Sequence, residues 1–164
     1  GLTQAETIKR MNQLMTELNK TAADIIRQYP VNACTDVTGF GLLGHLSEMT
    51  RSSKLDAEII LVQVPLIPGT LEFASADIIP GGTKDNLAYL DQIVIWDPSV
   101  GNVYKHILSD AQTSGGLLFS IPEKYRESIL NDLHQAGNKE AAAIGHFRKE
   151  KNSKIHITKS TAYE

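Results

Sequence analysis

Apolar residues recur every three or four positions from Leu2 to Tyr29. This spacing predicts one long amphipathic helix over 2–29, which Pro30 ends. We expect Thr3 to cap its start, with Glu6 three residues later completing a capping box.

The rest of the chain predicts short strands and helices separated by breaks rich in glycine and proline. The expected strands are 31–37, 56–65, 117–121, 141–147 and 154–158. A helix is expected after the glycine turn at 39–41, ending at about residue 51, and further helices at 70–76, 103–108 and 123–136. The last of these has Pro122 at its start and Gly137 after its end. Loops are expected at 80–83, 97–101 and 114–116, and 86–93 fits a helix or a strand. Helices in alternation with short strands predict a layered α/β or α+β domain.

Composition narrows the class of protein. The chain has 164 residues and 18.0 kDa, with 41% hydrophobic and 21% charged residues, which is typical of one globular domain. A net charge of −3 argues against a general nucleic-acid binder. One cysteine excludes an intramolecular disulfide and a cysteine-based zinc site. The apolar runs are too short to span a membrane. Because the first residue is Gly1 and not methionine, we expect the chain to be a fragment of a longer protein.

Three glycine-containing segments carry the candidate chemistry, at 35–41, 80–83 and 110–116. In the first, Asp36 lies at the end of a predicted strand between two threonines. Carboxylate and phosphate oxygens are the ligands that Mg²⁺ prefers, and a following helix N-terminus would favour an anion. The segment therefore predicts a magnesium–phosphate site. The alternative is that Asp36 caps the helix and the glycines only permit close packing.

The other two segments leave similar alternatives open. Asp110 with the run 113–116 fits either an anion site or a capped turn. For 81–83 a simple turn is the preferred interpretation and an anion-binding loop is the alternative. Cys34 together with five histidines raises the hypothesis of a Cys–His nucleophile, but cysteine in an apolar strand is more often buried and structural. His45 is expected on a helix face, and no two histidines have the spacing of metal ligands on one helix.

Four segments resemble the selenophosphate synthetase (selenide, water dikinase) family. They are ACTDVTGFGLLGHL at 33–46, SDAQTSGGLL at 109–118, PGGT at 80–83 followed by Asn86, and AIG at 143–145. Ala111 stands where the family more often has proline. The order and spacing of the segments agree with the family from the first helix to about Phe147.

The resemblance implies an α+β fold, a three-layer α/β/α domain with a mixed sheet like the C-terminal domain of aminoimidazole ribonucleotide synthetase. Residues 1–30 would be a connector helix from an N-terminal half that this chain lacks, and 31–164 the C-terminal domain. The family converts ATP, selenide and water to selenophosphate, AMP and phosphate. Its nucleophile, cysteine or selenocysteine, and a partner lysine lie in the absent half, so Cys34 is not that nucleophile.

The resemblance also assigns site residues. Asp36 matches the family's magnesium-binding aspartate. The adjoining phosphate-proximal turn is matched by Thr38, Gly39 and Gly41. A second segment at the cleft, without an assigned role, is matched by Asp110, Thr113, Ser114 and Gly115. Mg²⁺ and ATP would be bound mainly by the absent half.

For the full-length protein the resemblance implies a homodimer in the cytoplasm, without nucleic-acid or membrane partners. The fragment alone is expected to be inactive. The alternatives are another ATP-dependent enzyme of the same superfamily and a non-catalytic binding module.

Overall fold

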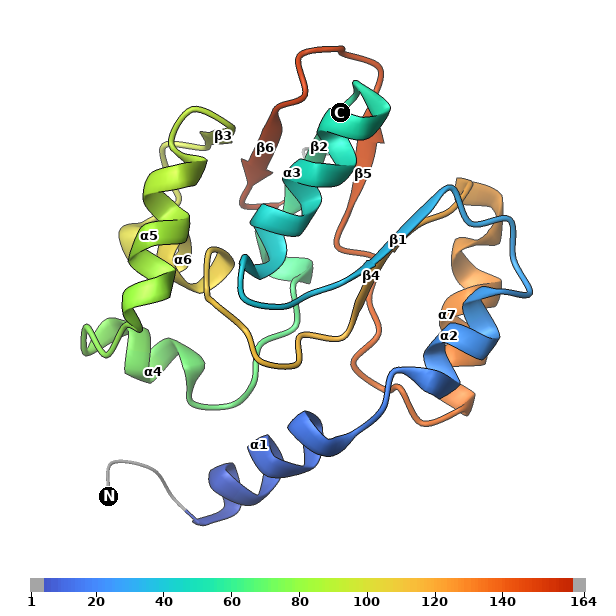
Figure 1. The fold of residues 1–164 in the computed structure, drawn as a ribbon, viewed down its shortest axis with the longest axis horizontal. Helices are drawn as coiled ribbons and strands as arrows, with labels where there is room; N and C mark the ends of the chain where they lie inside the picture. The colour runs from blue at the N-terminus through green and yellow to red at the C-terminus, as the bar shows by residue number, and fades with distance from the viewer. Residues whose placement is uncertain (1–4, 161–164) are drawn as a thin grey trace.

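The computed structural model describes residues 5–160, which form seven α-helices, six strands and two short 3-10 turns (Figure 1). The helices are α1 (Ala5–Thr16), α2 (Lys20–Ile26), α3 (Gly41–Ser53), α4 (Thr70–Ser75), α5 (Gly81–Leu90), α6 (Asn102–Leu108) and α7 (Arg126–Gln135). The strands are β1 (Ala33–Asp36), β2 (Asp56–Ile60), β3 (Val94–Trp96), β4 (Leu117–Ser120), β5 (Gly145–Arg148) and β6 (Ile155–Thr158). The 3-10 turns are η1 (Leu61–Gln63) and η2 (Glu123–Tyr125).

The strands form two separate sheets. The larger has the order β3-β6-β2-β5, in which β2 runs parallel to β6 and antiparallel to β5. The smaller is an antiparallel ribbon of β1 and β4, which pairs Asp36 with Leu117. The expected α+β class with a mixed sheet is confirmed.

The apolar residues form two cores, and the ribbon contributes to both, with Leu118 packed against the larger and Phe119 against the smaller. In the main core α3 packs on the four-stranded sheet, and Leu43, Leu90 and Ile155 are fully buried there. In the second, smaller core α2 lies against α7 beside the ribbon, with Ile26 and Leu133 buried. Figure 1 shows β1 and β4 crossing between the two groups of helices, so the ends of the ribbon are held from both sides.

One buried charge fixes the larger sheet. Asp56, at the start of β2, is 1% exposed and accepts hydrogen bonds from the backbone N–H groups of Asn152 (2.8 Å) and Lys154 (3.1 Å). Its second oxygen lies 3.0 Å from His156 Nε2. A carboxylate buried with this many donors is stabilised in its charged form. It therefore anchors the turn between β5 and β6 to β2.

The predicted helix over 2–29 is wrong within the described residues, because it breaks at 17–19 into α1 and α2. The Thr16 hydroxyl donates to the carbonyls of Asn12 and Gln13, and such local bonds compete with helix continuation. The break lets α2 turn onto α7, whereas α1 has no buried residue. The predicted cap at Thr3 lies outside the described residues.

The other differences concern element ends. The strand predicted over 56–65 ends at Ile60, where η1 begins. The loop predicted at 80–83 ends at Pro80, because Gly81 already begins α5, and the ambiguous stretch 86–93 is the end of α5 and a turn. Strand β3 was not predicted. The helices over 70–76, 103–108 and 123–136 are confirmed within a few residues, and Gly137 has the positive φ of 99° expected after a helix.

No helix within residues 5–160 combines the length and apolar character that a membrane crossing requires.

Candidate functional site

The three segments that the sequence singled out lie together in the structure. We call them the loop cluster, defined as residues 36–41, 83–86 and 109–116. The backbone joins the first segment to the third: Val37 N–H donates to Gly116 O (2.9 Å), Gly115 N–H to Val37 O (2.9 Å) and Gln112 N–H to Thr38 O (3.2 Å). Because these bonds continue the β1–β4 ladder, Asp36 lies beside the 113–116 turn.

Helix α5 holds the third segment through two side chains. The Thr83 hydroxyl is 1% exposed, donates to Asp110 Oδ1 (2.6 Å) and accepts from Ala111 N–H (3.2 Å). The Asn86 amide donates to the carbonyls of Gly39 (2.9 Å) and Ser109 (3.1 Å). One carboxylate oxygen of Asp110 is therefore bound to α5, and the Thr83 hydroxyl is used both as a donor and as an acceptor. The sequence reasoning gave Thr83 and Asn86 no such role.

Two glycines of the cluster are required by close packing. Gly41 has φ 70°, and a Cβ there would lie 2.5 Å from the Asp110 carbonyl oxygen. A Cβ on Gly115 would lie 2.7 Å from Val37 Cγ1. Such distances exclude any other residue without a backbone shift. For Gly41 this agrees with the alternative that the glycines after Asp36 permit close packing, whereas a Cβ on Gly39 would meet no atom within 4 Å.

Asp36 is the last residue of β1 and is exposed. The residue before the first turn of α3 is Phe40, so the alternative that Asp36 caps this helix is wrong. Within residues 5–160 its carboxylate makes no hydrogen bond or ion pair, and no group of three acidic, histidine or cysteine side chains could enclose a metal ion. The single free carboxylate fits Mg²⁺ held by one protein ligand together with phosphate oxygens and water.

The other predicted site residues differ in exposure. Gly39, Thr113, Ser114 and Gly115 are exposed, Thr38 and Asp110 are half-buried, and Gly41 is buried. A cavity of about 1040 Å³ is lined by residues of α1, α7, the ribbon and the larger sheet. Ser114 and Gly115 line it, whereas Asp36 does not.

A hydrogen-bonded chain of side chains runs from the loop cluster along α3. Thr38 Oγ1 lies 3.0 Å from His45 Nε2, and His45 Nδ1 lies 3.3 Å from a carboxylate oxygen of Glu48. His45 is only 7% exposed, and the Phe40 ring packs edge-on against it at 5.9 Å. The sequence reasoning placed His45 correctly on a helix face but not in this chain. Its spacing to Glu48, three residues on one helix face, was the available signal.

Cys34 is exposed, contrary to the prediction that it is buried in a strand. It shares one face of the ribbon with Asp36, two residues along β1, and both residues are exposed. Partial burial and then the negative charge of Asp36 raise the pKa of the Cys34 thiol. A raised pKa leaves less thiolate, which argues against a nucleophile at this position.

We predict that Thr83→Val lowers the free energy of unfolding by about 1–3 kcal/mol. Valine keeps the shape of the side chain, but it leaves the Asp110 carboxylate and Ala111 N–H without their partner. Denaturant unfolding of the 164-residue chain measures the change. The matched control is Thr21→Val on the exposed face of α2, expected within about 0.5 kcal/mol. Equal effects of both substitutions would contradict a special role for Thr83.

Comparison with known proteins identifies the domain. Residues 3–158 match the family described as "AIR synthase related protein, C-terminal domain". Among curated relatives, the "Selenide, water dikinase" of Carboxydothermus hydrogenoformans is 40% identical over 137 residues, which are 84% of this chain and 40% of the relative. Two proteins of the same name are similar to a comparable degree. That of Aliarcobacter butzleri is 38% identical over 144 residues, which are 88% of this chain and 41% of the relative. That of Clostridioides difficile is 40% identical over 148 residues, which are 88% of this chain and 42% of the relative.

The chain thus spans about two fifths of the length of the curated relatives that it matches. The resemblance based on the four sequence segments is confirmed. Because the family match runs from the first helix to the last strand, the chain belongs to the family of AIR synthase related C-terminal domains.

Proposed function

We propose that this domain is part of a selenide, water dikinase, which forms selenophosphate from ATP, selenide and water and releases AMP and phosphate. The observation that carries the proposal is the shared name of relatives that are 37–41% identical over most of this chain. The loop cluster supports it, because the matching motifs at 36–41 and 109–116 form one connected unit that includes the exposed carboxylate of Asp36.

In this proposal Asp36 is a magnesium ligand that this domain presents to ATP bound mainly by the N-terminal half. Bound Mg²⁺ would neutralise charge on the polyphosphate, which phosphoryl transfer requires. Gly39 and the exposed turn 113–115 flank Asp36 and leave room for the phosphates to approach the backbone. Asp110 shapes this surface through its bond to Thr83.

Two other functions are weaker. Another ATP-dependent enzyme of the superfamily would share the fold, but the relatives cited above all carry the dikinase name. A non-catalytic binding module would have no need for a free carboxylate held beside a rigid loop cluster. ATP cleavage that does not depend on selenide favours the first, and absence of cleavage favours the second.

We predict that the 164-residue chain alone does not turn over ATP, because the proposed nucleophile and most ATP ligands belong to the N-terminal half. Anaerobic incubation with Mg-ATP and selenide, followed by chromatographic assay of AMP, measures this. The full-length protein is the positive control. Selenide-dependent AMP release by the 164-residue chain would show that the domain carries a complete site.

The remaining features of the proposal concern the longer protein. Residues 1–30 would connect the two halves. The helix α1 leaves Ile8, Met11 and Met15 between 41% and 48% exposed, and Leu18, just after it, is 78% exposed, which suits a segment with a second contact. A homodimer and a cytoplasmic location stay predictions.

A further inference from the structure

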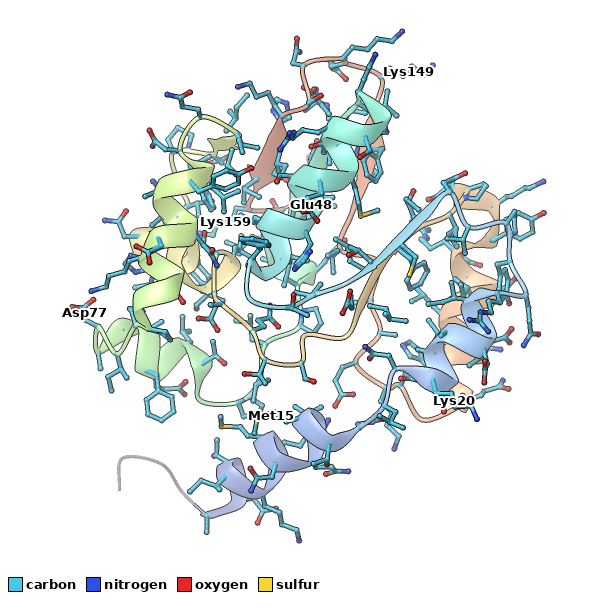
Figure 2. All side chains as sticks on the ribbon, viewed as in Figure 1. Met15, Lys20, Glu48, Asp77, Lys149 and Lys159 are labelled. Carbon is cyan, nitrogen blue, oxygen red and sulfur yellow. The ribbon has the colours of Figure 1, made fainter. Side chains whose placement is uncertain are left out.

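The side-chain chain Thr38–His45–Glu48 has no role in the function proposed above. Glu48 lies on the side of α3 that faces the viewer in Figure 2, and its side chain is 58% exposed, whereas the His45 side chain is 9% exposed. The imidazole thus joins an exposed carboxylate to the half-buried hydroxyl of the loop cluster. Phe40, which directly precedes α3, packs against the ring and limits its rotation.

The partners of His45 determine which nitrogen carries the hydrogen. An ionised carboxylate only accepts hydrogen bonds, so the contact with Glu48 requires a hydrogen on Nδ1. When the ring is neutral, Nε2 is then an acceptor, and the hydrogen bond at 3.0 Å comes from the Thr38 hydroxyl. In that state the single hydrogen of Thr38 is used inside the protein.

We propose that His45 is a positioning residue: its Nε2 atom holds the Thr38 hydroxyl hydrogen, so that Thr38 can offer a ligand only its oxygen lone pairs. Two features of the structure support this. The ring contacts Phe40 on one side and has a hydrogen-bond partner at each nitrogen. Thr38 itself lies two residues from Asp36 in a backbone bonded to both neighbouring segments.

The consequence concerns the ligand that Thr38 meets. Phosphate oxygens are acceptors, and a hydroxyl without a free hydrogen does not bind them. A hydroxyl that can only accept suits a cation or the water bound to a cation. The inference rests on the proposed function and refines it: Thr38 would face the magnesium side of the substrate, with Asp36, and would not bind the phosphate directly.

The first test is a spectroscopic one that needs no activity. Long-range ¹H–¹⁵N NMR spectra of the full-length protein distinguish the two neutral histidine tautomers, and His45→Gln assigns the signal. We expect the hydrogen on Nδ1, and a shift of the Nε2 resonance in Thr38→Val but not in Thr38→Ser. A hydrogen on Nε2, or no response to Thr38→Val, would overturn the inference.

The second test uses two amides of matched polarity. Gln at position 45 can place its carbonyl oxygen near Nε2 and keep the bond from Thr38, whereas Asn reaches only the Nδ1 position and keeps the contact with Glu48. We expect His45→Asn to lower kcat/KM for Mg-ATP about tenfold and His45→Gln to stay within about threefold.

Thr38→Val combined with His45→Asn should be no worse than Thr38→Val alone, because both remove the same interaction. Equal losses for Asn and Gln, or losses that multiply in the double variant, would overturn the inference. If the wild-type full-length protein makes no selenophosphate, the proposed function fails, and the NMR experiment still decides the role of His45.

Discussion

Replacement of Asp36 by asparagine is expected to lower selenophosphate formation by the full-length protein about 100-fold or more. Asparagine keeps the size of the side chain but removes the charge, and loss of a group that stabilises transferring phosphate charge has effects of this size. Because Asp36 is exposed and has no partner within residues 5–160, the substitution should leave the melting temperature unchanged. Initial rates at saturating Mg-ATP and selenide measure the loss.

The matched control is Asp77→Asn. Asp77 is an exposed carboxylate after α4, away from the loop cluster (Figure 2), and its positive φ of 56° suits asparagine equally well. We expect its rate within about twofold of wild type. An Asp36→Asn protein with more than a third of wild-type activity would contradict a role for Asp36 in metal binding.

The largest expected effect on stability is that of Asp56→Asn, which should lower the free energy of unfolding by about 3 kcal/mol. Both oxygens of the carboxylate accept hydrogen bonds, whereas an asparagine amide has only one oxygen that can accept them. The donors at Asn152, Lys154 and His156 therefore lose bonds to a charged acceptor in a buried place. Urea unfolding at pH 7 measures the change.

The same carboxylate should make stability depend on pH. Burial alone would raise the pKa of Asp56, but the hydrogen bonds from His156 and from the backbone at Lys154 and Asn152 outweigh it and lower the pKa from 3.8 to about 2. The stabilisation is therefore complete above pH 3.8 and is lost as the pH falls through about 2. The Asp56→Asn protein should lose less stability over this range than wild type.

The control for Asp56 is Glu150→Gln, which removes an exposed ion pair with Arg148 at the same end of the sheet. Exposed pairs contribute little, so we expect a change below about 1 kcal/mol. If the two substitutions have equal effects, or if wild type and Asp56→Asn unfold in parallel between pH 5 and pH 2, the buried carboxylate does not stabilise the sheet as described.

Local sequence patterns correctly predicted the elements whose conformation is determined by neighbouring residues in the sequence. Helix 123–136 has Pro122 before it and Gly137 after it, and the structure has a 3-10 turn and a helix there with Gly137 in the left-handed region. Close packing was an alternative for the glycines after Asp36, and it holds for Gly41, because the Asp110 carbonyl oxygen leaves no room for a Cβ there.

The errors arose where distant residues decide the structure. Pro80-Gly81-Gly82-Thr83 predicts a loop by composition, but Thr83 and Asn86 bind the carbonyls and carboxylate of two remote segments and hold the stretch in α5. Cys34 was expected to be buried because its neighbours are apolar. The two-stranded ribbon leaves that face uncovered, and only the tertiary arrangement shows this.

The candidate site was predicted as three separate segments, and hydrogen bonds join them in the structure. The bonds that join 36–41 to 109–116 link residues more than 70 positions apart, for which a single sequence carries no signal. The Thr38–His45–Glu48 chain depends on side-chain orientations that a helix allows but does not require.

The most direct test of the proposed function is phosphorus NMR of the reaction of the full-length wild-type protein with Mg-ATP and selenide under anaerobic conditions. The account predicts a selenophosphate resonance together with AMP and phosphate in equal amounts, and no ATP loss when selenide is left out. ATP that remains intact, or that is cleaved only to ADP with or without selenide, would contradict it.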